Sequence, residues 1–316
     1  MAGSGCRKAA SVANQSGDFF LHTVGGLGHA AGVEALTVDE MQKAVRLALA
    51  EDVGSGDATT LATVPEAAQA TALMRAREPL VVAGLALAEA AFRELSGRVE
   101  FQRIAEDGHA VKEGQDLLRI AGPARAILSG ERVALNFVQR LSGVATLTSQ
   151  FVEAIKGTRA QILDTRKTTP GWRRLEKYAV ACGGGRNHRM GLHDMILIKD
   201  NHLAALKGES PNAIAAAVAR ARAKYPQLKV EVEADTLEQA EQAAAAGADF
   251  ILLDNMNLIQ LRLAVQQVRG RAQTEASGGV NLASVRGIAG TGVDFISVGA
   301  ITHSARAVDI GLDFLE

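Results

Sequence analysis

Four cationic side chains are gathered in one stretch of the chain, where each stands beside an apolar run or a glycine cluster. Arg166, Lys167, Arg189 and Lys199 lie within residues 164–202, which read DTRKTTPGWRRLEKYAVACGGGRNHRMGLHDMILIKDNH. Cations held in a structured, glycine-rich place bind carboxylates or phosphates, and arginine offers each of these groups a planar fork of donors. The segment therefore predicts an anion-binding site.

The charge balance of the whole chain makes this cluster a local feature. The 316 residues contain 34 Lys+Arg against 35 Asp+Glu, for a net charge of −1. Such a balance indicates a small-molecule site rather than a nucleic-acid-binding surface. Cys6 and Cys182 are the only two cysteines, which indicates a reducing compartment. No apolar run has the length of a membrane span, so we expect a cytoplasmic protein without a membrane partner.

Two carboxylates close neighbouring apolar strands. In KVEVEAD, period-two alternation puts Lys229, Glu231 and Glu233 on one face. We expect Glu231 to pair with Lys229 or with arginines inside a polar barrel, and Glu233, nearest the strand end, to be functional. Asp254 follows the apolar residues of FILLDN, where an ionised carboxylate needs a cation. Mg²⁺ prefers oxygen ligands and usually bridges to substrate phosphates, so we expect Glu233 and Asp254 to hold Mg²⁺.

Glycines follow the last two expected strands. Ser277, Gly278 and Gly279 come after one of them, and Gly299 comes after the other. Glycines at this place let backbone N–H groups approach an anion, and barrel enzymes often bind phosphate there. A tight turn into a helix is the open alternative for Gly278 and Gly279.

The loop GGGRNHR delivers a histidine next to an arginine. It contains His188 and Arg189, and it lacks the GxxxxGK[ST] spacing of a P-loop. A lone histidine is more often structural than catalytic, so His188 is a candidate only because of its cationic neighbours. The roles of His202 and His303 stay open.

Other cations of the chain have simpler explanations. Arg174 and Lys177 lie on a short helix after Pro170-Gly171, where solvated helix charges explain them. Arg132 lies in ERVALNFVQRL, far in sequence from the cation cluster. It is either an exposed helix residue or a contributor to a site that spans domains or subunits.

Six short apolar strands, each followed by a helix-like segment, position the candidate residues. The strands read QILDTRK, MILIKDN, KVEVEAD, FILLDN, TEASGG and DFISVGA. Polar or glycine residues stand at the carboxyl ends of all six, namely Arg166, Lys199, Glu233, Asp254, Ser277 and Gly299. That end carries the chemistry in α/β barrels. The pattern therefore predicts an enzyme built on a parallel barrel or an open α/β sheet.

The residues before the six strands predict a domain of a different type. Thr37 begins a helix over residues 37–50, and short β-like stretches follow within residues 67–120. The segment DGHAVKEGQDLLRIAG has the pattern of a biotinyl or lipoyl sandwich, which would suggest a carrier module. Lys112 stands at the wrong place for a modified carrier lysine, so we favour a sandwich without a cofactor.

A long helix and a small-residue extension complete this first part. The spacing of apolar residues predicts a helix over residues 129–155, with a bend at Gly143. Residues 1–33 are rich in Gly, Ala and Ser and are expected to form a poorly ordered extension.

These motifs together resemble one enzyme family. DTRKTTPG, LEKYAV, GGGRNHRMGLHDMILIKDNH, VEVEAD, ILLDNM, EASGGV and DFISVGAITHS, with EDVGSGDATT and ERVALNFVQRLSG before them, are similar to quinolinate phosphoribosyltransferases. The resemblance covers about residues 36–316. Trp172 stands where the family usually has an aliphatic residue, a change that affects packing and no catalytic role.

The resemblance implies a fold of two domains. An N-terminal α/β sandwich would span residues 34–143 and be joined by the C-terminal tail, residues 304–316. An incomplete parallel α/β barrel of the type II phosphoribosyltransferase kind would span residues 144–303.

The resemblance also implies a reaction. Phosphoribosyl pyrophosphate and quinolinate would give nicotinate mononucleotide, pyrophosphate and CO2 with Mg²⁺, a step of NAD biosynthesis. Family members are dimers or assemblies of dimers, and Arg132 would be supplied to the partner's site. A related phosphoribosyltransferase for nicotinate, or one associated with molybdate transport genes, is the alternative, although a monocarboxylate would not need Arg132, Arg166 and Arg189 together.

The family's functional residues map onto the candidate positions. Arg166, His188 and Arg189 would line the quinolinate pocket, and Lys167 and Lys199 would lie between quinolinate and the phosphoribosyl donor. Glu233 and Asp254 would serve the ribose hydroxyls and magnesium, and Ser277, Gly278, Gly279 and Gly299 the 5′-phosphate.

Overall fold

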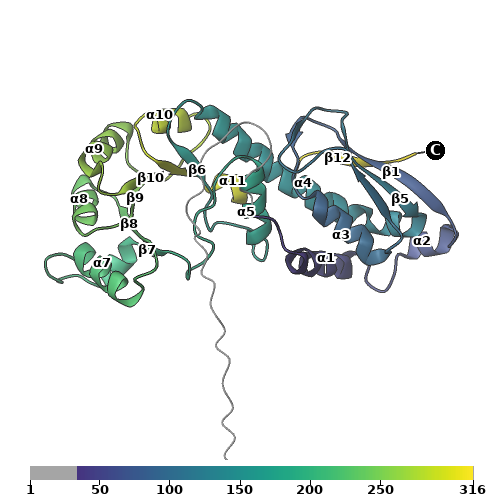
Figure 1. The fold of residues 1–316 in the computed structure, drawn as a ribbon, viewed down its shortest axis with the longest axis horizontal. Coiled ribbons are helices and arrows are strands. Elements are labelled where there is room, and N and C mark those ends of the chain that lie inside the picture. The colour runs from purple at the N-terminus through teal and green to yellow at the C-terminus, as the bar shows by residue number, and fades with distance from the viewer. Residues whose placement is uncertain (1–33, 316) are drawn as a thin grey trace, which may run out of the picture.

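A computed structural model describes residues 34–315 of the chain, and the expected extension over residues 1–33 lies outside the described part. Two lobes lie side by side in Figure 1, with helix α4 extending from one to the other. The first lobe contains an antiparallel sheet and the second a parallel one. This arrangement agrees with the fold expected from the sequence.

The first lobe is built on a four-stranded sheet that includes the end of the described chain. Its order is β12 (Ile310–Leu315), β1 (Gln69–Ala76), β5 (Asp116–Pro123) and β3 (Glu100–Arg103), and β2 (Leu80–Val81) pairs with β4 (Ala110–Val111) separately. Alternate residues Ala72, Met74 and Ala76 of β1 are fully buried, as expected for a sheet with one covered face. The strand β12 pairs with β1 in antiparallel register, from Thr71 opposite Leu315 onward.

Helices cover this sheet. They are α1 (Val38–Asp52), α2 (Ala58–Thr63), α3 (Leu85–Leu95) and the long α4 (Ala124–Ala154). The expected cap of α1 is confirmed, because Thr37 and Glu40 form a reciprocal capping box. The helix α4 begins five residues before the sequence-based start at residue 129, directly after Pro123.

The structure gives Gly143 a reason that is independent of any bend in the helix. The helix α4 is unbroken from Ala124 to Ala154. A Cβ atom on Gly143 would lie 1.9 Å from the carbonyl oxygen of Arg306. Glycine is therefore needed because the C-terminal segment passes directly against the helix backbone.

The second lobe is an incomplete barrel. Its six parallel strands follow the order β6 (Gln161–Leu163), β11 (Phe295–Ser297), β10 (Gln273–Ser277), β9 (Phe250–Asp254), β8 (Val230–Ala234) and β7 (Ile196–Ile198). All six sequence-predicted strands are present. Because no hydrogen-bonded pairing joins β6 to β7 among the described strands, the barrel is open there.

Helices surround the barrel strands, as Figure 1 shows. They are α5 (Arg173–Cys182), α6 (Asp200–Ala204), α7 (Ala213–Lys224), α8 (Leu237–Ala245), α9 (Leu258–Val268), α10 (Val285–Ala289) and α11 (Ala300–His303). Apolar strand residues such as Val232, Ile251 and Leu253 are fully buried beneath them. None of the helices in the described range has the length and apolar character needed to cross a membrane.

Polar contacts fasten α4 and the first lobe to the barrel. Arg140 of α4 donates to Glu176 of α5 at 2.9 Å and to the carbonyl of Thr302 in α11 at 2.7 Å. The hydroxyl of Tyr178 donates to Asp107 at 2.7 Å, which joins α5 to a loop of the first lobe. The orientation of the barrel relative to α4 is thereby fixed by hydrogen bonds as well as by apolar packing.

Candidate active site

The candidate residues lie where the strand pattern places them, at one end of the barrel. Each follows or closes a strand: Arg166 and Lys167 after β6, Lys199 after β7, Glu233 in β8, Asp254 at the end of β9, Ser277 at the end of β10, and Gly299 after β11. The carboxyl ends of parallel strands meet at one edge, so these side chains share a surface.

An ion pair joins two neighbouring strand ends. The ammonium of Lys199 contacts a carboxylate oxygen of Glu233. Lys199 is also the N-cap residue of α6, and its backbone N–H donates to His202 Nδ1 at 2.9 Å. The imidazole of His202 therefore acts as a cap for this helix end.

A second pair of strand ends is joined through Asn255. This residue has a φ of 55°, and its N–H donates to the carbonyl of Ser277 at 3.0 Å. A Cβ atom on Gly278 would lie 2.2 Å from Asn255 Oδ1. Packing alone therefore requires a glycine at 278. Gly279, with a φ of 60° and nothing within 4 Å of its Cβ position, is left with open space in front of it.

The end of β11 brings a lysine and a histidine together. A Cβ atom on Gly299 would lie 3.1 Å from both Lys167 Cδ and His303 Nε2. The hydroxyl of Thr302 donates to the carbonyl of Lys167 at 2.7 Å. Lys167 and His303 therefore flank the Gly299 backbone, the place at which a phosphate was expected.

Two arginines approach each other at the barrel end. Arg189 is only 9% exposed and donates to the carbonyl of Met195 at 3.2 Å. Burial, and then the positive charge of Arg166, lower the pKa of Arg189, and the carboxylates of Glu231 and Asp194 offset this only in part. The Nε atom of Arg166 is itself buried without a partner among the described residues. Buried donors of this kind need an acceptor, so the pair forms a prepared site for an anion.

His188 is held inside the protein by both ring nitrogens. Its Nδ1 accepts the backbone N–H of Arg189 at 2.7 Å, and its Nε2 lies 3.0 Å from an oxygen of Glu231. Because Nδ1 accepts, the proton of the neutral ring must be on Nε2, which donates to Glu231. Burial is the main cause that lowers the pKa of His188 and keeps it neutral.

Comparison with known proteins identifies the family. The sequence profile of the quinolinate phosphoribosyl transferase N-terminal domain matches residues 57–142, and that of the C-terminal domain matches residues 144–313. The chain belongs to the quinolinate phosphoribosyltransferase family. The resemblance read from the motifs is thereby confirmed.

Three bacterial relatives match this chain over more than nine tenths of their own length. The nicotinate-nucleotide pyrophosphorylase [carboxylating] of Mycobacterium leprae is 46% identical over 282 residues, which is 87% of this chain and 97% of that protein. The probable enzyme of the same name from Bacillus subtilis is 42% identical, with 87% and 93% coverage. The solved structure of the nicotinate-nucleotide pyrophosphorylase from Francisella tularensis has a TM-score of 0.84 at 39% identity, with 90% and 99% coverage.

One buried ion pair of this chain was not predicted from its sequence. Lys177 was expected to be a solvated helix charge, but it is fully buried, and its ammonium contacts the carboxylate of Asp164. The expectation is wrong because the face of α5 that carries Lys177 packs onto the barrel. Lys177 also donates to the carbonyl of His188 at 2.9 Å, while Asp164 accepts the N–H of His188 at 2.8 Å. Arg174, the other expected solvated charge, instead pairs with Glu40 of α1 at 2.9 Å.

Glu275 is the second residue that was missed. It is 2% exposed in the interior of the barrel, beside the fully buried Glu231. Period-two alternation in β10 puts Glu275 on the same face as Ser277, and this signal was available in the sequence. Burial raises the pKa of Glu231 to about 7 and that of Glu275 to about 8. Glu231 is therefore interior, as expected. It contacts His188 and interacts electrostatically with Arg189, which fits the arginine alternative, whereas Lys229 pairs with Asp249.

The residues of this interior cluster are poor metal ligands in their present arrangement. Potential ligand atoms of His188, Glu231 and Glu275 lie within 4.8 Å of one another. A metal would bind the Nε2 lone pair, but the Nδ1 contact places the ring proton on Nε2. Glu233 and Asp254 suit magnesium better, because they are carboxylates at adjacent strand ends, with Ala234 opposite Leu253. One oxygen of Asp254 accepts from Asn255 at 2.6 Å, which orients that carboxylate.

Arg132 is the one candidate that the fold does not bring to the others. It is exposed on α4, and no hydrogen bond or ion pair within residues 34–315 joins it to the barrel residues. Arg132 can therefore be either an exposed helix residue or a residue that contributes to a site spanning domains or subunits, because its position in a single chain fits both.

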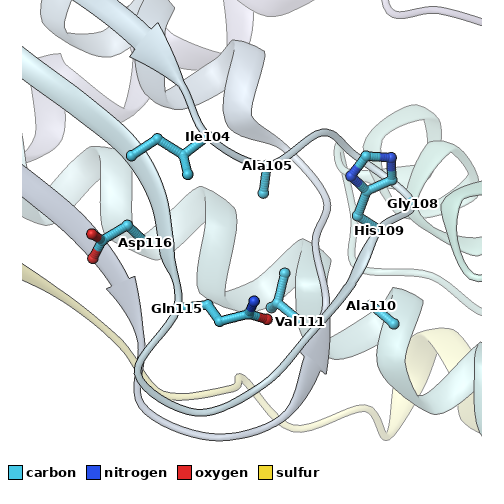
Figure 2. Close-up of a pocket in the computed structure, with 8 residues that line it drawn as sticks. All are labelled: Ile104, Ala105, Gly108, His109, Ala110, Val111, Gln115 and Asp116. Carbon is cyan, nitrogen blue, oxygen red and sulfur yellow. The ribbon is translucent and has the colours of Figure 1, made fainter.

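A surface cavity lies in the first lobe, away from these residues. It has a volume of about 640 Å³. As Figure 2 shows, its lining residues are Ile104, Ala105, Gly108, His109, Ala110, Val111, Gln115 and Asp116. Lys112 is an exposed turn residue between β4 and β5, and its N–H donates to the side chain of Gln115 at 2.6 Å. None of the barrel-end candidates lines this cavity.

Proposed function

We propose that this protein transfers the phosphoribosyl group of phosphoribosyl pyrophosphate to quinolinate and releases CO2, giving nicotinate mononucleotide and pyrophosphate for NAD biosynthesis. The observation that carries the proposal is the Arg166–Arg189 pair at the barrel end, in which Arg166 Nε is buried without a partner among the described residues and the pKa of the nearly buried Arg189 is lowered. Quinolinate has two adjacent carboxylates, and each would find a guanidinium fork there. The names of the relatives support the same reaction.

We assign the other end of the site to the phosphoribosyl donor. Gly299, flanked by Lys167, would bind the 5′-phosphate through its backbone, with Ser277, Gly278 and Gly279 nearby. Lys199 would stabilise the departing pyrophosphate, and Glu233 would favour positive charge on the ribosyl carbon. Glu233 and Asp254 would also hold Mg²⁺, which when bound neutralises charge on the pyrophosphate.

Transfer to the ring nitrogen prepares the loss of CO2. Attack by the nitrogen on the ribosyl carbon makes a pyridinium, and pyrophosphate leaves with the electron pair of its carbon–oxygen bond. Cleavage of the C2–carboxylate bond then leaves its electron pair on C2, next to the positive nitrogen, and a proton replaces CO2. Arg166 and Arg189 orient the carboxylates for this step.

We further propose a cytoplasmic homodimer, alone or within a higher assembly, in which Arg132 completes the partner's site. The exposure of Arg132 on α4 supports this. We propose residues 34–143 with 304–316 as the first domain and residues 144–303 as the barrel domain, and the pairing of β12 with β1 supports that division.

The role of Arg132 in the partner's site can be tested with two variants. Mixing an Arg132→Ala protein with a Lys199→Ala protein should restore activity, because heterodimers then contain one intact site. Exchange of subunits without recovered activity would exclude a shared site.

The reaction is tested directly with purified protein. Incubation with quinolinate, phosphoribosyl pyrophosphate and Mg²⁺ should yield CO2 and nicotinate mononucleotide, and omission of Mg²⁺ should abolish both. Nicotinate serves as the parallel acceptor. Product from nicotinate alone would refute the substrate and favour a related phosphoribosyltransferase.

A further inference from the structure

The imidazole of His188 has no free nitrogen to offer a substrate. Nδ1 accepts the N–H of Arg189, and Nε2 donates to Glu231. The backbone of His188 is equally engaged, since its N–H donates to Asp164 and its carbonyl accepts from Lys177. A residue fixed at four points beside a substrate-binding arginine is placed to orient that arginine.

We propose that Glu231 and Glu275 act as positioning residues for quinolinate binding, through His188, which sets the backbone of Arg189. The inference rests on the proposed function and changes the expected role of His188 from substrate contact to support. Neither glutamate touches the substrate in this scheme, because both side chains are buried in the barrel interior.

The direction of the hydrogen bonds explains why the pair of glutamates matters. His188 Nε2 lies 3.0 Å from Glu231 Oε2 and 3.5 Å from Glu275 Oε2. An acceptor on that side keeps the ring proton on Nε2, and this leaves Nδ1 free to accept the Arg189 N–H. If the acceptor were removed, the proton could move to Nδ1 and would repel that N–H.

The two glutamate side chains are hydrogen-bonded to each other, and two carboxyl groups form such a bond only through a proton between them. Glu231 Oε2 is the nearer acceptor for His188 Nε2, at 3.0 Å against 3.5 Å for Glu275 Oε2. Glu231 therefore accepts from His188, and Glu275 holds Glu231 in place.

Replacement of Glu275 gives the sharpest test. Glu275→Gln preserves a neutral donor at the same place and should keep the KM for quinolinate within about twofold. Glu275→Ala removes the hydrogen bond that holds Glu231 and should raise that KM roughly tenfold, the effect of one lost charge-assisted hydrogen bond, while the KM for phosphoribosyl pyrophosphate stays unchanged. Glu275→Leu fills the volume without a carboxyl group and carries the test if the alanine variant unfolds.

A double-mutant cycle shows whether the effect passes through the histidine. His188→Asn retains an acceptor near the Nδ1 position but removes the donor to Glu231. In that background, Glu275→Ala should add less than twofold to the KM for quinolinate, since coupled residues are not additive. Fully additive effects would overturn the relay, and so would equal changes in both KM values.

Controls separate this inference from the function itself. Glu89→Ala removes a 7%-exposed glutamate of the first lobe that pairs with Arg103, and it should lower Tm without raising the KM for quinolinate. Wild-type protein that makes no nicotinate mononucleotide would refute the proposed function. An active wild type with a normal KM in both Glu275→Ala and Glu275→Leu would refute the positioning role alone.

Discussion

Arg189 is constrained by its burial, by a neighbouring cation and by hydrogen bonds of its side chain and backbone. Its guanidinium is nearly buried, stands near Arg166 and donates to a single backbone carbonyl. Its backbone N–H is in turn held by His188. Glu231 and Asp194 compensate only in part for burial of this cation beside another, since the pKa of Arg189 is still lowered. Binding of the quinolinate dianion should therefore stabilise the protein.

Arg189→Ala tests this directly. The KM for quinolinate should rise roughly tenfold to a hundredfold, because a hydrogen bond between charged groups contributes about 1.5–3 kcal/mol. Steady-state kinetics measure the effect, and Arg220→Ala, which removes an exposed ion pair with Glu209, serves as the matched control. Unchanged quinolinate kinetics in the Arg189 variant would contradict the pocket assignment.

Trp172 has a structural role at the contact between the two lobes. Its ring stacks on Phe137 of α4 with centroids 5.1 Å apart and an angle of 18° between planes. Trp172→Leu should lower the free energy of unfolding by about 1 kcal/mol, the usual contribution of an aromatic pair. Urea denaturation measures this loss. A comparable change in kcat/KM for quinolinate would show that the stacking also shapes the site.

The identities of the barrel-end residues were predictable, but their partners were not. Asp254 and Lys199 were found because each ends an apolar run. The burial of Lys177 was missed because its partner, Asp164, is on another element, and only the fold shows which face of α5 meets it. Charge alone does not distinguish a solvated lysine from a buried one that is paired.

At the scale of elements, α4 packs so closely against the C-terminal segment that position 143 has no room for a side chain. Ala is intrinsically favoured over Gly inside a helix by about 1 kcal/mol, yet Gly143→Ala should destabilise the protein. The added methyl group meets the backbone oxygen of Arg306, and overpacking of this kind costs about 1–3 kcal/mol. Thermal unfolding gives the sign, and Gly97→Ala, with nothing within 4 Å, should be near neutral. A stabilised Gly143→Ala protein would contradict the close approach.

The barrel strands were predicted well because two sequence signals coincide, an apolar run and a polar residue at its carboxyl end. Strands such as β9 are apolar throughout and end on a polar residue, a pattern that is independent of the rest of the chain. The need for a glycine at 143 was not predicted, because its cause lies 163 residues further along the chain, at Arg306. The local periodicity of a sequence does not reveal contacts between residues that are this far apart in the chain.

For the molecule as a whole, a charged contact fastens the C-terminal segment to the first lobe. Glu78 accepts from Arg306 at 2.7 Å and from the N–H of Asp309 at 2.8 Å. The hydrogen bond from Arg306 is the first cause that lowers the pKa of Glu78 to about 2. A lowered carboxyl pKa stabilises the fold above the unfolded value near pH 4.5, and that contribution is lost as the pH falls toward 2.

Glu78→Gln should therefore lower Tm by roughly 1–2 °C at neutral pH, a small effect because Arg306 is exposed to solvent. The difference from wild type should shrink steadily as the pH falls from 4.5 to 2. Calorimetry across that range measures it. A difference that stays constant down to pH 2 would contradict the ionic origin of the contact.

The place of β12 beside β1 has a consequence for biosynthesis. Residues 310–315 leave the ribosome after the entire barrel, yet they form an edge of the sheet whose other strands lie between residues 69 and 123. During translation that sheet has an exposed edge at β1, since its final neighbour has not yet been made. The first lobe therefore emerges first but is completed last. Its sheet can be completed only after the whole barrel has been synthesised.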